Sequence, residues 1–155
     1  METTPRVEIR KAEVQDISAI HHIFTTAIQG IVSEYYSYEQ KTAWIQAVNP
    51  ESWSTRLIEL HFSVAVLESE IVGFVSWYGP EIVHVYVSDT FKKHGIGTVL
   101  MNHALGSMTA PDIGLTASLN AEHFYQSFGF VSEETLIKER NGVPIPCIRM
   151  RRSSV

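Results

Sequence analysis

The sequence predicts a mixed α/β fold, with antiparallel strands first and alternating strands and helices later. Two observations carry this prediction. Apolar runs rich in Val, Ile, Phe and Tyr fill the middle of the chain, and segments whose apolar residues have helical spacing lie on both sides of them. A chain of 155 residues with 45% hydrophobic and 19% charged residues can bury one core, so we expect a single domain over residues 1–155.

The first third of the chain is predicted to contain one strand and three helices. Residues 7–11 have the pattern of a short strand. Asp16 is a candidate N-cap for the first helix, which ends near Gly30. The apolar face of that helix would consist of Ile17, Ile20, Phe24 and Ile28. A second helix is expected over residues 37–47, and the Asn49-Pro50 pair that follows it prevents its continuation. A short third helix is expected over residues 51–60.

Three strands are predicted next, over residues 62–67, 71–78 and 81–87. The polar residues 68–70 make the first two strands a hairpin, and Gly79-Pro80 separates the second from the third. These segments form the antiparallel part of the predicted sheet.

Strands alternate with helices in the last part of the chain. A helix is expected over residues 95–107 and a strand over 113–118. Another helix would place four residues on one side: Ala121, Phe124, Tyr125 and Phe128. Gly129 ends this helix as a C′ glycine. Two closing strands, residues 130–133 and 145–151, are expected around a turn at residues 140–144.

The composition argues against several classes of protein. A net charge of −5 disfavours a general nucleic-acid binder. The single cysteine, Cys147, cannot form an internal disulfide, and no Cys/His spacing suggests a metal site. The N-terminus has no apolar signal region, and no apolar run approaches the roughly 18 residues that a membrane span needs. We therefore expect a cytoplasmic protein without a membrane or nucleic-acid partner.

A glycine-containing turn with positive charge precedes the helix at residues 95–107. It reads "KKHGIGTVL", with Lys92, Lys93 and His94 before Gly95 and Gly97. A helix N-terminus exposes free N–H groups, and glycines let the backbone approach a ligand, so the turn suits a phosphate or pyrophosphate. The alternative is a plain strand-to-helix turn. The segment lacks the Gly-Lys-Ser/Thr of a P-loop and the third glycine of a dinucleotide fingerprint.

Taken with its surroundings, this turn resembles the acyl-CoA-binding motif of the GCN5-related N-acetyltransferases (GNAT), Arg/Gln-x-x-Gly-x-Gly/Ala. The downstream segment "TASLNAEHFYQSFGF" resembles the strand and helix that close the family's domain, and "EIVGFVSW" resembles the strand that precedes the motif. The resemblance covers nearly the whole chain. It implies a mixed, mostly antiparallel sheet of about six or seven strands flanked by about four helices, with strands splayed at the cofactor site.

The resemblance implies that acetyl-CoA is a co-substrate and that an amine is acetylated. Backbone amides around His94, Gly95, Ile96, Gly97 and Thr98 would hold the pyrophosphate, helped by the Thr98 hydroxyl and the charge of Lys92 and Lys93. Pantetheine would pair with the strand edge from Val85 to Val87, and a main-chain N–H near Val85 would polarise the thioester. Two positions depart from the family pattern. Lys92 stands where Arg or Gln is usual, and Ser118 stands where Asn is frequent.

Tyr125 matches the tyrosine that the family places near the sulfur, so it is the candidate general acid for the departing thiolate. The alternative is a purely packing role beside Phe124 and Phe128. Glu81 is the candidate base, since some family members carry a glutamate at this spacing before the turn. Its alternative is a solvated carboxylate, and a chain of water molecules could also take the proton. His84 is expected on the opposite face of the same strand, because side chains alternate.

The acceptor site is expected in the region from Ile31 to Trp44, which contains Tyr35, Tyr36 and Tyr38. These aromatic side chains could surround an amine or pack against the sheet. The acidic balance of the chain would suit a cationic acceptor, but the sequence does not choose among a polyamine, an aminoglycoside, an amino acid, a peptide N-terminus and a protein lysine. The alternative to an enzyme is a non-catalytic acyl-CoA-binding or partner-binding module of the same fold. The family also includes many dimers, which makes a homodimer a candidate assembly.

Overall fold

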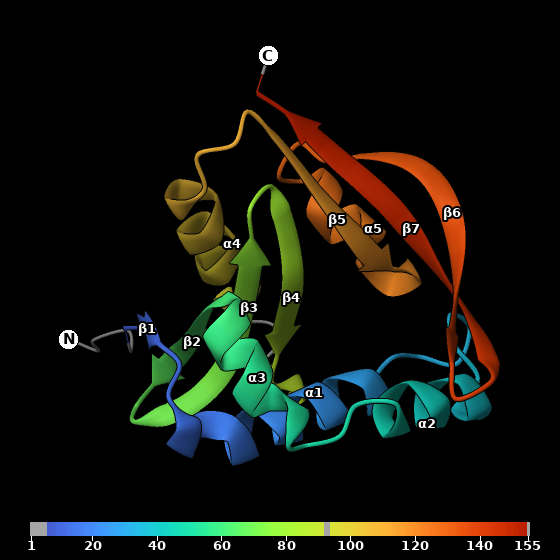
Figure 1. Cartoon of the computed structure of the whole chain (residues 1–155), viewed down its shortest axis with the longest axis horizontal. Helices are drawn as coiled ribbons and strands as arrows, with labels where there is room; N and C mark the ends of the chain where they lie inside the picture. The colour runs from blue at the N-terminus through green and yellow to red at the C-terminus, as the bar shows by residue number, and fades with distance from the viewer. Residues whose placement is uncertain (1–5, 92–93, 155) are drawn as a thin grey trace.

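A single seven-stranded sheet organises the molecule in the computed structural model, which describes residues 6–91 and 94–154 (Figure 1). The strands follow the order β1-β2-β3-β4-β5-β7-β6. Their bounds are β1 (Glu8–Lys11), β2 (His61–Leu67), β3 (Glu70–Tyr78), β4 (Glu81–Val87), β5 (Asp112–Ser118), β6 (Val131–Arg140) and β7 (Val143–Ser153). All neighbours are antiparallel except β4 and β5, so the predicted mixed, mostly antiparallel sheet is confirmed.

Five α-helices are present in the described chain, one more than the four or so expected. Their bounds are α1 (Ile17–Gln29), α2 (Tyr38–Gln46), α3 (Ser52–Glu59), α4 (Ile96–Ser107) and α5 (Glu122–Gln126). Helix α2 begins with a capping box, in which the Ser37 hydroxyl accepts from the Gln40 amide and the Gln40 side chain accepts from the Ser37 amide. No helix in the described residues is both long and apolar enough to cross a membrane.

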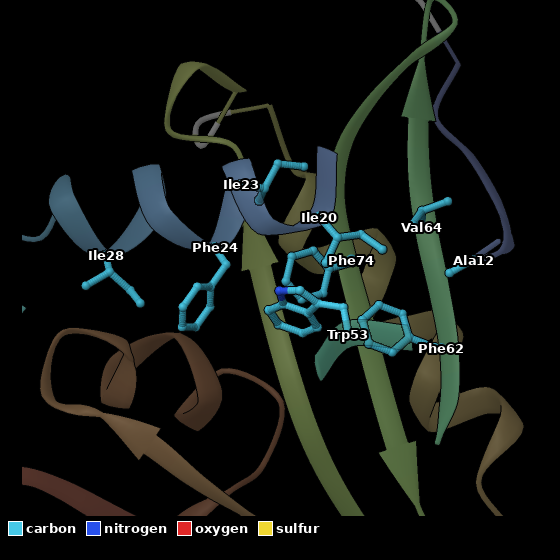
Figure 2. Close-up of a cluster of buried hydrophobic side chains, with 9 residues drawn as sticks. All are labelled: Ala12, Ile20, Ile23, Phe24, Ile28, Trp53, Phe62, Val64 and Phe74. Atoms are coloured by element: carbon cyan, nitrogen blue, oxygen red, sulfur yellow. The ribbon is translucent and has the colours of Figure 1, made fainter. Parts of the chain in front are cut away.

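Helices α1 and α3 cover one face of strands β2 to β4. The predicted apolar face of α1 is confirmed for Ile20, Phe24 and Ile28, which are all buried. Figure 2 shows Trp53 of α3 between α1 and the sheet, and its ring makes edge-on contacts with Phe24 and Phe74. This aromatic cluster fixes α1 and α3 on the sheet and so positions the loops beside β4.

Helices α4 and α5 cover the opposite face. Ile96 and Leu100 of α4 pack with Val72 and Val75 of β3, whereas α5 packs over the half of the sheet made by β5, β7 and β6. The two helices therefore lie on either side of the line along which β4 meets β5.

Strands β4 and β5 are paired only where they begin. Glu81 lies opposite Gly114, and from there the two strands diverge (Figure 1). The backbone edges beyond this point are therefore not joined to each other, and the expectation of strands splayed at this junction is met.

The last two strands are much longer than the sequence indicated. The expected strands at residues 130–133 and 145–151 are parts of a hairpin that turns at Asn141 and Gly142, both with positive φ. The segment "SEETLIKER" has little apolar alternation because β6 is an edge strand that lies largely exposed. The expected helix around Phe124 is shorter, and Phe128 lies beyond its end.

Asp16 does not cap α1 with its side chain. Its carboxylate instead accepts two hydrogen bonds from the Arg10 guanidinium, at 2.8 and 2.9 Å, and one from the Glu13 amide. The bond from Arg10 outweighs burial and lowers the pKa of this carboxyl. The residue that sequence reasoning assigned to the helix terminus therefore links β1 to the start of α1.

Candidate active site

A groove of about 250 Å³ lies where β4 and β5 diverge. It brings together four residues that were expected at the cofactor: Val85, Val87, Ser118 and Tyr125. The wall across from them is made by the end of α1 and by Trp44 of α2. A groove between two separated strand edges offers unpaired main-chain groups to an extended ligand.

The turn before α4 has the backbone that its glycines predict. Gly95 has a φ of +76°, a left-handed conformation that side chains disfavour, while a Cβ there would meet nothing within 4 Å. Gly97 serves close packing instead, because a Cβ there would lie 3.1 Å from Cζ of Phe124. The first turn of α4 thus depends on glycine at one position for conformation and at the other for space.

Three amides of this turn, those of Ile96, Gly97 and Thr98, precede the first i to i−4 bond of α4, which runs from the Val99 N–H to the Gly95 carbonyl at 3.2 Å. The Thr98 side chain is exposed at the same turn. The amide expected from His94 is engaged elsewhere, because it donates to the Phe91 carbonyl at 3.1 Å. Lys92 and Lys93 lie outside the described residues.

Tyr125 reaches the groove from α5 and is 8% exposed. Its ring contacts Phe124 and Phe130 with centroid distances of 5.2 and 6.2 Å. Burial raises the pKa of the Tyr125 phenol well above its ordinary value of 10. The hydroxyl therefore stays protonated at neutral pH and can donate a hydrogen bond, while burial makes it a weaker acid than a free phenol. Tyr125 thus packs against Phe124 and Phe130 and also lines the groove.

A larger cavity of about 570 Å³ adjoins the groove. Five residues line both spaces: Trp44, Val83, Tyr86, Thr116 and Ser118. The larger cavity also contains Arg56 at the end of α3 and Arg140 at the end of β6. A molecule held in the larger cavity would therefore lie next to the groove, along the five residues that line both spaces.

Two aromatic residues of the predicted acceptor region belong to this cavity. Tyr36 is 1% exposed, and its hydroxyl donates to the Pro146 carbonyl (2.7 Å) and accepts from the Leu119 amide (2.9 Å). Trp44 packs edge-on against the Tyr36 ring. Tyr35 and Tyr38 are exposed and line neither space. Tyr36 thus ties the segment before α2 to the ends of β5 and β7.

His84 lines the larger cavity from β4. Its Nδ1 lies 2.6 Å from the hydroxyl of Ser76, which is fully buried. Burial, with a smaller contribution from the charge of Arg56, lowers the pKa of this imidazole to about 3. The ring is therefore neutral at physiological pH and a weak proton acceptor.

Glu81 is held in an ion pair at the start of the split between β4 and β5. Its two carboxylate oxygens accept from both terminal nitrogens of Arg149, at 2.8 and 2.5 Å. Glu81 is not among the residues that line either space. The expected alternation between Glu81 and His84 does not hold, because a bulge at Val83 adds one residue to β4 opposite Ser76 and Trp77.

Several residues of the site were not anticipated. Asn120 lines the groove between β5 and α5, and its place five residues before Tyr125 in a strand-to-helix connection is a signal that could have pointed to it. Arg56 and Arg140 line the larger cavity but come from segments far apart in the chain, which no local motif links. No group of three or more His, Cys, Asp or Glu side chains that could hold a metal occurs in residues 6–91 and 94–154.

Comparison with known proteins gives a consistent family assignment. Residues 32–153 match the sequence model of the acetyltransferase (GNAT) domain. The uncharacterized N-acetyltransferase YafP of Escherichia coli K12 is 26% identical over 124 residues, which are 80% of this chain and 81% of that protein.

Solved structures show the same fold. The crystal structure of a GCN5-related N-acetyltransferase from Rhodopseudomonas palustris, also described as a class-II aminotransferase, superposes with a TM-score of 0.88 at 26% identity, covering 99% of this chain and 98% of that one. The PaiA N-acetyltransferase of Thermoplasma acidophilum, solved in complex with coenzyme A, has a TM-score of 0.75 at 18% identity, covering 96% of this chain and 99% of that one.

Proposed function

The chain belongs to the GCN5-related N-acetyltransferase family, and from this premise we propose that it transfers the acetyl group of acetyl-CoA to a primary amine. The observation that carries the proposal is the groove between the diverging strands β4 and β5, which contains Tyr125. A family relative of the same fold was solved with coenzyme A, which supports the choice of donor.

The groove and the start of α4 fit the two ends of acetyl-CoA. The amides of Ile96, Gly97 and Thr98, together with the partial positive charge of the helix terminus, suit a pyrophosphate. The free edge of β4 at Val85 and Val87 suits the amides of pantetheine, and Ser118 and Asn120 offer polar side chains on the opposite side.

Transfer requires that the amine attack the thioester carbonyl, which forms an amide and releases the thiolate of coenzyme A. Tyr125 is our candidate to protonate this thiolate, because its side chain lines the groove and a phenol carries its proton at neutral pH. A main-chain N–H of β4 near Val85 would stabilise the negative charge that develops on the carbonyl oxygen.

The acceptor amine has an ordinary pKa of about 10.4 and must lose a proton before it attacks. Glu81 is paired with Arg149 and lines neither space, and His84 is a weak acceptor at neutral pH. We therefore propose that water in the larger cavity carries the proton away, and we treat Glu81 as the base to be tested.

The test has two steps on the full chain. Calorimetric titration with acetyl-CoA should show one site, and release of free thiol should follow when an amine is added. Binding without thiol release across amino acids, polyamines, aminoglycosides and peptides would favour a non-catalytic acyl-CoA-binding module. If acetyl-CoA produces no heat in the titration and does not change the melting temperature of the protein, the proposal is contradicted and a partner-binding domain is favoured.

A further inference from the structure

The larger cavity carries positive charge that the molecule as a whole does not. The chain has a net charge of −5, yet the cavity is lined by three cationic side chains, those of Arg56, Lys138 and Arg140, and by one carboxylate, that of Glu59. The local field in the cavity therefore has the sign opposite to the overall charge, and it attracts anions.

Arg56 and Arg140 differ from the paired arginines of this fold. Three other arginines each contact a carboxylate: Arg10 with Asp16, Arg149 with Glu81, and Arg151 with Glu133. No such ion pair is formed by Arg56 or Arg140 with any carboxylate of the residues that the structure describes. Arg140 makes a hydrogen bond to the Glu139 carbonyl at 3.3 Å, which leaves most of its donors for a ligand.

Arg56 is held in a fixed position at the cavity. Its Nη1 donates to the Ser52 hydroxyl at 3.0 Å, and its Cζ lies 4.8 Å from the centre of the Trp53 ring. Burial lowers the pKa of this guanidinium; Tyr86 acts in the opposite direction, and the charge of Arg140 adds to the lowering. A half-buried cation beside a second cation is stabilised by an anion that contacts both.

The positions of these two arginines and of Tyr125 indicate how an acceptor would be oriented when bound. Arg56 and Arg140 line the larger cavity but not the groove, whereas Tyr125 lines the groove but not the larger cavity. An acceptor whose amine faces the groove would therefore place its other end toward the arginines. The volume of about 570 Å³ suits a small molecule.

We infer that the acceptor is a small primary amine that also carries an anionic group, a carboxylate or a phosphonate, and that this group binds Arg56 and Arg140. The inference rests on the proposed acetyl transfer and narrows it to one substrate class. It reverses the expectation of a cationic acceptor, because the charge of the cavity rather than that of the chain selects the ligand. Guanidinium groups bind either anion through paired N–H donors.

The experiment measures thiol release from acetyl-CoA with matched pairs of amines. Each standard amino acid is compared with its amide, in which an uncharged carboxamide replaces the carboxylate. 2-Aminoethylphosphonate is compared with ethanolamine, so that the effect of a phosphonate is measured separately from that of a carboxylate. Spermidine and kanamycin represent cationic acceptors. We expect an acid-bearing amine to have a kcat/KM about tenfold or more above that of its neutral counterpart.

Two variants then locate the contact. Arg140→Gln should raise KM for the acid-bearing amine about tenfold and leave that for the neutral counterpart within about twofold. Arg56→Gln should change the two KM values in the same way. Because the two variants are independent, either one can test the inference if the other folds poorly. Arg6→Ala removes an exposed arginine that lines neither space, and it should change neither value.

The outcomes separate this inference from the proposal beneath it. Failure of acetyl-CoA to bind in the calorimeter overturns both. Binding of acetyl-CoA without acetylation of any member of the panel also counts against both. When acetylation occurs, the inference alone is overturned if a cationic or neutral amine is preferred, or if both arginine variants discriminate as the unmodified protein does.

Discussion

At the scale of single residues, burial keeps two ionisable groups beside the site uncharged. It raises the pKa of the Tyr125 phenol and lowers that of the His84 imidazole to about 3. Both effects have the same cause, since a low-dielectric environment disfavours the charged form of either group. Burial thus makes the Tyr125 phenol a weaker acid than a free tyrosine, and it makes His84 a weaker base than a free histidine.

Replacement of Tyr125 tests the proposed acid. Tyr125→Phe keeps the ring that packs against Phe124 and removes the hydroxyl. We expect kcat to fall about 100-fold, because the thiolate then leaves unprotonated, while acetyl-CoA affinity measured by calorimetry changes little. Tyr78→Phe, at an exposed tyrosine outside both spaces, is the control. An unchanged kcat for Tyr125→Phe would mean that the side chain has only a packing role.

Replacement of Glu81 distinguishes a base from a structural carboxylate. Glu81→Gln should leave the pH dependence of kcat unchanged and lower the free energy of unfolding by about 1 kcal/mol, since the paired contact with Arg149 is weakened in a partly exposed site. Glu133→Gln, which removes the more exposed pair with Arg151, is the matched variant and should cost less. Loss of the acidic limb of the pH–rate profile in Glu81→Gln alone would identify Glu81 as the base.

At the scale of elements, the groove between β4 and β5 could be predicted from the sequence, whereas the larger cavity could be predicted only in part, through Tyr36 and Trp44. Gly95 and Ser118 lie at strand-to-helix connections, and Tyr125 lies in the short helix after the second of these, so the order of residues along the chain fixes their relative places. The larger cavity joins Arg56 of α3 to Arg140 of β6, and their proximity depends on how distant elements pack. The polar edge strand β6 carries no strong alternation, so its length escaped prediction.

Two glycines of α4 provide a comparison within one helix. Gly106→Ala should raise the free energy of unfolding by about 0.5–1 kcal/mol, because a Cβ there meets nothing within 4 Å. Gly97→Ala gains the same helix propensity, but its methyl group crowds Phe124, so we expect no gain in the free energy of unfolding. Because the methyl group also reduces the space for a ligand at the turn, we expect acetyl-CoA to bind about tenfold more weakly. Thermal denaturation and calorimetry measure both effects. Equal behaviour of the two variants would argue against a ligand at this turn.

At the scale of the whole molecule, the two halves of the sheet meet at a single parallel pairing, and the polar groups buried near it make stability depend on pH. Strands β1 to β4 carry α1 and α3, strands β5 to β7 carry α5, and the site lies between the halves. His84 lies on this boundary, with its Nδ1 bonded to the buried Ser76 hydroxyl.

The pKa of His84 gives this pH dependence a sign. The native imidazole has a pKa of about 3, whereas the unfolded chain has the ordinary value of 6.5, so between these values the unfolded state binds more protons. Stability must therefore fall as the pH is lowered through this window. From pH 7 to pH 5 His84 should contribute a loss of about 2 kcal/mol, a figure that holds for any native pKa well below 5.

Urea denaturation of the unmodified protein and His84→Gln at pH 7 and pH 5 isolates this contribution. The variant should lose less stability between the two pH values, by about 2 kcal/mol, although it is less stable at pH 7.

Other titrating groups do not affect this comparison. His21 and His103, whose pKa values are also lowered by burial, are present in both proteins, so their contributions cancel in the difference. Asp16, whose pKa is lowered from 3.8, loses its contribution only below this window. His61→Gln removes an exposed histidine and serves as the control. Equal pH dependence in the unmodified protein and His84→Gln would show that His84 becomes protonated without unfolding, which would make it a candidate base.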